Sequence, residues 1–139
     1  MQHTTTQPKI TVIAQTHQSV FNKSIFVIAL ASLGGITILA GIVSLISAII
    51  LLSNTSTPSL ASTILTDAVL DIIIGTLIIA SSRAFVQGKI LAIWLFSGSL
   101  LLDSLYSLIR GYELHYIFMG LGVLLIWQML KFKKEWATS

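Results

Sequence analysis

Residues 25–52 read IFVIALASLGGITILAGIVSLISAIILL and contain no charged side chain. The hydrocarbon core of a bilayer is about 30 Å thick, and an α-helix needs roughly 20 apolar residues to cross it. This stretch is long enough to cross, and the residues that precede it are mostly polar. We therefore expect a membrane-spanning helix over residues 25–52, preceded by a polar cytoplasmic N-terminal tail over residues 1–24.

Three further apolar stretches follow the first one. They cover approximately residues 62–80, 90–109 and 112–130. Short polar connections separate the four stretches, and connections of this length favour antiparallel neighbours. The sequence therefore predicts an all-α fold: an integral membrane four-helix antiparallel bundle over residues 25–130, followed by a basic cytoplasmic C-terminal tail over residues 131–139.

The composition supports a membrane protein. Of the 139 residues, 55% are hydrophobic and 9% are charged, whereas soluble domains carry about 25% charged residues. So few charges cannot cover the surface of a small water-soluble domain, and a disordered chain needs low hydrophobicity and high charge. The absence of cysteine excludes a disulfide scaffold and thiolate catalysis. We expect the lipid bilayer to be the main partner of this chain.

Basic residues are distributed unevenly between the two ends of the predicted bundle. Seven of the eight fall on the side of the termini and only Arg110 on the other; the seven are Lys9, Lys23, Arg83, Lys89, Lys131, Lys133 and Lys134. Cytoplasmic loops carry the excess of Lys and Arg, so we expect both termini in the cytoplasm. The net charge of +3 is explained by this topology. A nucleic-acid partner is not expected, because no basic domain presents these charges.

Three carboxylates, Asp67, Asp71 and Asp103, fall inside the predicted spans. Ionisable groups within a span are costly and normally face the interior of the bundle. Asp67 and Asp71 are four residues apart and share one helix face. With a rise of 1.5 Å per residue, all three reach a similar depth in the outer half of the membrane. The polar residues expected to support them are Ser99, Ser107, Arg110, Glu113 and His115.

Two interpretations of these carboxylates are open. In the first, the cluster binds a proton or a small cation from the outer side. In the second, the acids are protonated or paired with Arg110 and hold the helices together through hydrogen bonds.

Small residues recur along the first predicted span, at Ala31, Gly35, Gly41, Ser44 and Ala48. Such residues let helix backbones approach each other inside a bilayer. They predict close packing within the bundle, or alternatively contact with a second copy or with a larger membrane complex.

No catalytic constellation is recognisable in the sequence. All three histidines lie outside the predicted spans or at an edge, which argues against a buried haem, and no spacing typical of zinc ligands occurs. Neither a Gly-rich phosphate loop nor a nucleophile elbow is present. We expect no enzymatic activity, no metal and no cofactor.

Residues 75–102 read GTLIIASSRAFVQGKILAIWLFSGSLLL. This segment resembles small four-span bacterial inner-membrane proteins of uncharacterised function, in which a basic Gly-containing turn joins a helix ending in small residues to one that begins with a Trp-bearing apolar run. Residues 128–136, QMLKFKKEW, resemble the basic and aromatic endings of these proteins. The resemblance implies a location in the bacterial inner membrane and no particular activity.

Two functions remain after these exclusions. The first is a non-enzymatic accessory, assembly or interaction subunit of the membrane. The alternative is a proton- or cation-coupled small transporter that uses Asp67, Asp71 and Asp103.

Overall fold

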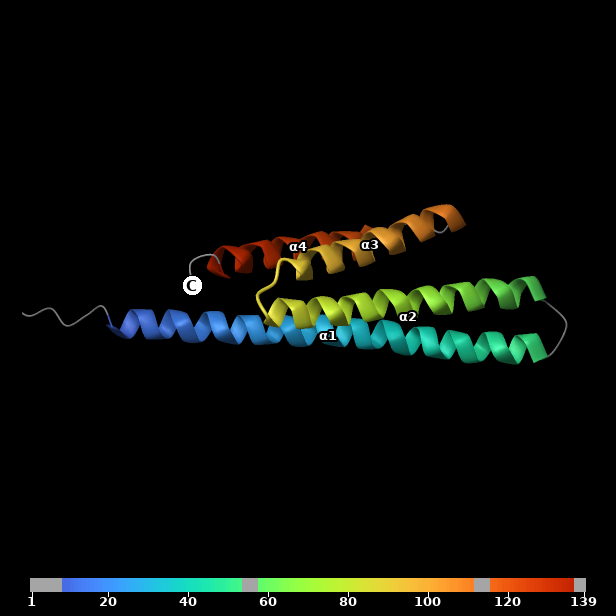
Figure 1. The fold of residues 1–139 in the computed structure, drawn as a ribbon, viewed down its shortest axis with the longest axis horizontal. Helices are drawn as coiled ribbons and strands as arrows, with labels where there is room; N and C mark the ends of the chain where they lie inside the picture. The colour runs from blue at the N-terminus through green and yellow to red at the C-terminus, as the bar shows by residue number, and fades with distance from the viewer. Residues whose placement is uncertain (1–8, 54–57, 112–115, 137–139) are drawn as a thin grey trace, which may run out of the picture.

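The computed structural model describes residues 9–53, 58–111 and 116–136, and their side chains over residues 23–53, 58–111 and 119–134. All four elements are α-helices: α1 (Lys9–Ser53), α2 (Pro58–Val86), α3 (Leu91–Arg110) and α4 (Tyr116–Trp136). Each helix packs against the next one in the chain, and consecutive helices run antiparallel (Figure 1). The prediction of an all-α bundle is confirmed.

Three segments within the described part of the chain are long and apolar enough to cross a membrane: Lys23–Ser53, Pro58–Val86 and Leu91–Arg110. Their outward surfaces are apolar as well, since Ile36 is 65% exposed, Leu101 70% and Ile109 73%. A soluble monomer rarely exposes continuous apolar surface of this kind. The chain is therefore a multi-pass membrane protein in which hydrocarbon covers these side chains.

Helices α1 and α4 extend beyond the limits expected from hydropathy. Helix α1 begins at Lys9, so much of the expected polar tail is helical, and its 45 residues span about 68 Å at 1.5 Å per residue. It projects past the other helices (Figure 1). Helix α4, described from Tyr116, continues to Trp136, beyond the expected limit at residue 130. Hydropathy marks the limit of the membrane, whereas the backbone hydrogen bonds of a helix continue into water.

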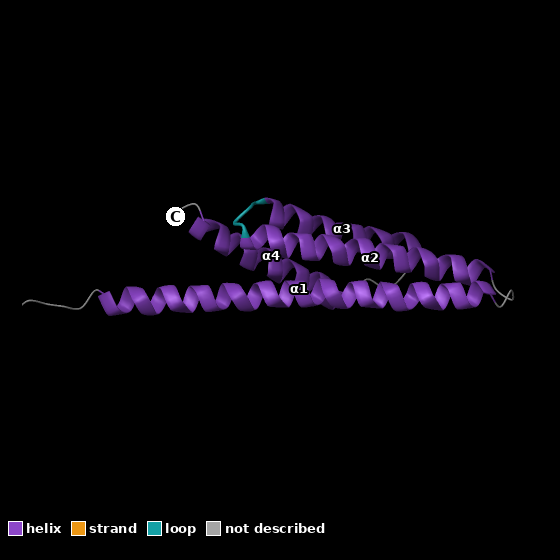
Figure 2. Ribbon diagram, turned by 60° about the horizontal axis from the view of Figure 1, so that its bottom comes forward, coloured by secondary structure: helices purple, strands orange, loops and turns teal. Residues whose placement is uncertain are grey.

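The reversal expected at Gly88 and Lys89 is present and ends α2 (Figure 2, teal loop). Gly88 has a φ of 67°, a left-handed conformation that glycine adopts without a steric penalty. The amide of Gly88 donates to the carbonyl of Phe85 at 3.0 Å, and that of Lys89 donates to Ala84 at 3.0 Å. These two bonds satisfy carbonyls at the end of the helix.

A seam of small residues joins α1 to α2. Its members are buried and recur every seven residues on both helices; they are Gly34, Gly41 and Ala48 on α1, and Ala61, Ala68 and Gly75 on α2. A Cβ atom added to Gly34 would lie 2.8 Å from the carbonyl oxygen of Gly75, and one added to Gly41 would lie 2.8 Å from that of Ala68. The two backbones are thus in contact, which the absence of side chains makes feasible.

The seam includes only part of the small-residue set expected from the sequence. Gly41 and Ala48 belong to it, whereas Ala31 and Ser44 are half-buried and a Cβ on Gly35 would meet nothing within 4 Å. A step of four residues rotates a row by about 40° around the helix, whereas a step of seven drifts by only about 20°. The seven-residue repeat therefore follows the facing helix more closely.

A second face of α2 contacts α3 through two hydrogen bonds whose α2 residues are fourteen positions apart. Near the turn, the buried hydroxyl of Ser81 donates to the carbonyl of Ala92 at 2.7 Å. Farther along, Asp67 accepts a hydrogen bond from Tyr106. Because α2 contacts α1 with one face and α3 with another, it is the central helix of the bundle.

Three phenylalanine rings join α1, α2 and α4 close to the turn between α2 and α3. Phe26 lies 5.0 Å from Phe85 and 5.9 Å from Phe132, and Phe85 lies 5.5 Å from Phe132, measured between ring centroids. Such tilted and edge-on arrangements are favourable for aromatic pairs. The cluster places the lysine-rich end of α4 beside the end of α2.

Candidate functional site

A cavity of about 220 Å³ lies between the helices. All four contribute to its wall: Leu33 and Thr37 from α1; Asp71, Ile74 and Ile78 from α2; Phe96, Ser99, Leu100 and Asp103 from α3; and Leu121, Gly122 and Leu125 from α4. The cavity therefore exists only when the whole bundle is assembled.

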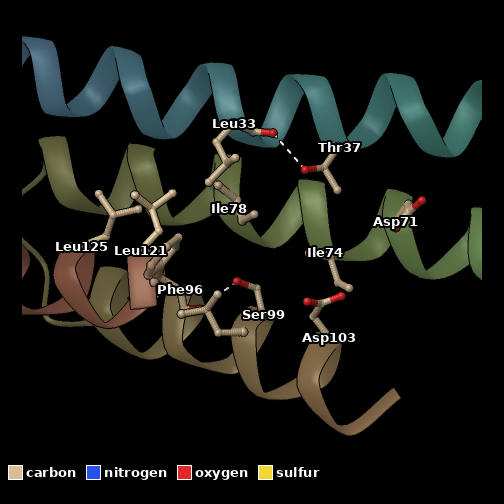
Figure 3. A pocket seen from close by; sticks show the side chains of 12 residues that line it. Leu33, Thr37, Asp71, Ile74, Ile78, Phe96, Ser99, Asp103, Leu121 and Leu125 are labelled. Atoms are coloured by element: carbon tan, nitrogen blue, oxygen red, sulfur yellow. Dashed lines mark hydrogen bonds between the residues drawn. The ribbon is translucent and has the colours of Figure 1, made fainter. Parts of the chain in front are cut away.

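The two ends of this cavity differ in polarity (Figure 3). One end is apolar and includes Leu121, Leu125 and Phe96, whereas Asp71 and Asp103 lie at the other. Asp71 is half-buried and Asp103 is exposed. Two carboxylates from different helices reach the same end of the cavity because of the register between α2 and α3. Residues 67 and 106 lie opposite each other. Because the two helices run antiparallel, residues 71 and 103 then lie at a similar height along the bundle.

The two hydroxyl groups in the cavity wall direct their hydrogens away from the cavity. Thr37 Oγ1 donates to the carbonyl of Leu33 at 2.9 Å, and Ser99 Oγ donates to the carbonyl of Phe96 at 2.7 Å (Figure 3). A hydroxyl has one hydrogen, and an ionised carboxylate has none. Toward a ligand, the Thr37 hydroxyl and the two carboxylates in their ionised form therefore act only as hydrogen-bond acceptors, whereas Ser99 is fully buried.

No lysine or arginine is among the residues that line the cavity. In the described part of the chain, the hydrogen bonds and the ion pair that involve a carboxylate side chain go to Asp67, and none goes to Asp71 or Asp103. Among the described residues, no hydrogen bond or ion pair thus engages the two carboxyl groups at the acidic end of the cavity.

Asp67, by contrast, is engaged in what we call the Asp67 cluster, which consists of Asp67, Tyr106 and Arg110. The hydroxyl of Tyr106 donates to Asp67 Oδ1, and Arg110 Nε donates to that hydroxyl at 2.9 Å. Arg110 Nη2 lies 4.0 Å from Asp67 Oδ1, and the guanidinium carbon lies 5.3 Å from the centre of the tyrosine ring. Asp67 therefore links α2 to α3 and does not line the cavity.

The structure thus divides the three carboxylates expected to act together. Asp67 has the surroundings of a helix-linking residue paired with Arg110, whereas Asp71 and Asp103 are among the residues that line the cavity. Of the supporting residues, Ser99 lines the cavity and Ser107 is half-buried outside its lining. Glu113 and His115 lie outside the described residues.

Sequence reasoning assigned no role in the site to Thr37 or Tyr106. Thr37 is an isolated polar residue in an apolar span, and its position relative to the carboxylates depends on how α1 is rotated. A signal for Tyr106 was available, because it lies four residues before Arg110 on the same face of α3. Pairing with Asp67 would have been a reasonable prediction from that spacing.

Among the described residues, no three histidine or acidic side chains converge to form a metal site. No family model, curated protein or solved structure matches this chain. Its function must therefore be inferred from the cavity and from the membrane-spanning helices.

Proposed function

We propose that this chain is a small, non-enzymatic membrane transporter that binds a cation in the four-helix cavity, either as its substrate or as the coupling ion. One observation carries the proposal: among the described residues, Asp71 and Asp103 line the cavity together with the acceptor oxygen of Thr37, and ionised carboxylates only accept hydrogen bonds. A metal cation supplies positive charge to these acceptors, and an ammonium ion supplies both positive charge and N–H donors. An apolar side chain at either position would avoid the cost of placing an ionisable group within a span.

The proposal includes a fourth span and a defined orientation. The ring of Phe132 on α4 lies 5.5 Å from that of Phe85 near the end of α2, so α4 returns to the level of the turn between α2 and α3. The basic residues cluster at this end, as is typical of cytoplasmic ends. With both termini in the cytoplasm, the carboxylates occupy the outer half of the membrane. The resemblance noted for residues 75–102 adds the bacterial inner membrane as the location.

A second candidate function is that of an accessory or interaction subunit, and it is favoured by a different observation. A Cβ added to Gly35, Gly98 or Gly120 would meet nothing within 4 Å. Glycines without a neighbouring side chain on several helices would allow another membrane helix to approach closely. Such a helix would belong to a second copy or to a larger membrane complex.

Transport assays in reconstituted vesicles test the first proposal. Uptake of radiolabelled sodium or methylammonium, driven by an imposed pH gradient, is compared between the wild type, the double variant Asp71→Asn/Asp103→Asn and empty vesicles. The double variant is expected to fall to the level of the empty vesicles. Ser107→Ala is the control, because it changes a half-buried polar side chain of α3 outside the cavity lining, and it should retain uptake. Equal uptake by the wild type and the double variant would refute the proposal.

A further inference from the structure

We infer that the ligand of the cavity is a small amphiphilic amine, bound as an ammonium ion that carries N–H groups and a hydrocarbon body about the size of an aromatic ring. This inference rests on the cation site proposed above and adds the chemical class of the ligand. Neither a bare metal ion nor a purely apolar molecule matches both ends of the cavity.

The acidic end favours N–H donors over charge alone. Asp71 and Asp103 are acceptors when ionised, and the hydroxyl of Thr37 can only accept because its hydrogen bonds to a helix carbonyl. A primary ammonium group offers three donors, and a hydrogen bond between two charged groups is stronger than one between neutral groups. A quaternary ammonium ion carries the same charge with no N–H group, and it would leave these acceptors without donors.

The opposite end of the cavity favours a hydrocarbon body. It is lined by Leu33, Phe96, Leu121 and Leu125 (Figure 3), which offer nothing to a hydrated metal ion. The volume of about 220 Å³ exceeds that of an apolar cavity of roughly 150 Å³ that accommodates benzene. A ring with a short ammonium arm therefore fits, with Leu33, Leu121 and Leu125 beside the ring.

The nearest arginine does not compete for the acidic end. Arg110 is held by the hydroxyl of Tyr106 at 2.9 Å and by Asp67 at 4.0 Å. Asp67 precedes Asp71 by one helical turn, so the guanidinium group is retained beyond the end of the cavity and does not fill it. The Asp67 cluster thus leaves Asp71 and Asp103 available to a ligand.

Binding to the full chain in phosphatidylcholine nanodiscs tests the inference with four probes: benzylammonium, methylammonium, benzyl alcohol and benzyltrimethylammonium. Benzylammonium is expected to bind about tenfold or more tightly than methylammonium, because the ring buries apolar surface. Benzyl alcohol lacks the charge and benzyltrimethylammonium lacks the N–H donors, so both should bind at least about tenfold more weakly than benzylammonium.

Two variants separate the two ends of the cavity. Asp71→Asn/Asp103→Asn should lose binding of both ammonium ions, with Ser107→Ala, a half-buried polar position outside the cavity lining, as the control that keeps it. Leu125→Phe fills the apolar end and should lower the affinity for benzylammonium to that of methylammonium. Retained methylammonium binding would show that this variant is folded.

The possible failures are distinguishable. If methylammonium binds in a manner that depends on Asp71 and Asp103, but benzylammonium binds no more tightly, the amphiphilic class is wrong and the cation site stands. If no cation binding depends on these two residues, both proposals fail. If benzyltrimethylammonium equals benzylammonium, the requirement for N–H donors is refuted.

The ethanolamine headgroup of a phospholipid carries the same ammonium group. It is the alternative to a free amine as the source of the bound ammonium ion. Repeating the titration in phosphatidylethanolamine nanodiscs distinguishes it from a free amine. We expect equal affinities in both lipids, because the two carboxylates repel the phosphate next to the ethanolamine nitrogen. A lower affinity for benzylammonium in phosphatidylethanolamine would identify the headgroup as the occupant and overturn the free amine.

Discussion

Asp67 and Asp71 are one helical turn apart and yet have different partners. The side chain of Asp67 is 32% exposed and accepts a hydrogen bond from Tyr106, whereas Asp71 lines the cavity. Their common helix face was predictable from the spacing of four residues. Their separate roles were not, because these depend on which residue of α3 lies opposite each one.

Replacing Tyr106 by Phe tests the helix-linking role of the Asp67 cluster. The variant loses one hydrogen bond to Asp67 and another from Arg110, and we expect the free energy of unfolding to fall by about 1 kcal/mol. Reversible unfolding in mixed micelles measures this quantity. Ser107→Ala removes a half-buried hydroxyl from the neighbouring position and is expected to have little effect. An unchanged stability of Tyr106→Phe would show that the cluster does not link the helices.

At the scale of the elements, the seam between α1 and α2 brings two helix backbones into direct contact. A Cβ on Gly75 would lie 2.6 Å from Ile38 Cγ1 and 2.7 Å from the carbonyl oxygen of Gly34. The backbone atom cannot rotate away, so the helices would have to separate. The same substitution at Gly35 would place the methyl group in open space.

This contrast gives a matched pair of variants. Gly75→Ala is expected to lower the free energy of unfolding by about 1–3 kcal/mol, the usual range for overpacking. Gly35→Ala should leave stability unchanged or raise it by up to about 1 kcal/mol, because alanine favours a helix over glycine. Thermal unfolding of the two purified variants measures both effects. A Gly75→Ala variant as stable as Gly35→Ala would contradict the close approach of the backbones.

The elements were more predictable than their contacts. Apolar runs located α2 and α3 to within a few residues, because the membrane requires a minimum length of apolar helix. The pairing of Gly34 with Gly75 was not apparent, since a single helix sequence carries several candidate rows of small residues. Only the facing helix determines which of these rows is buried.

At the scale of the whole molecule, the order of the spans predicts which residues share a side of the membrane. The protein contains no cysteine, so a single introduced cysteine is a unique label site. Ser59→Cys lies at the start of α2 and Lys89→Cys in the turn after it, and both positions are exposed. A membrane-impermeant maleimide should label Ser59→Cys in intact cells and Lys89→Cys only after permeabilisation.

The fourth span is tested by the same reagent at a third position. Lys133→Cys, near the end of α4, should behave like Lys89→Cys, because four crossings return the chain to the side of the turn. Labelling of Lys133→Cys in intact cells would contradict the fourth span, and labelling of Lys89→Cys there would reverse the orientation.

The two contact faces of α2 have a consequence for its length. The contacts with α1 recur every seven residues and those with α3 are fourteen apart, so both depend on the helix keeping its phase and its length from Asp67 to Ser81. One alanine inserted after Gly75 would turn the two halves of α2 by about 100° relative to each other and is expected to abolish the monodisperse peak in size-exclusion chromatography. Seven inserted residues restore the phase but lengthen α2 by about 10 Å, so they should preserve the bundle only when the facing helices are lengthened by the same amount.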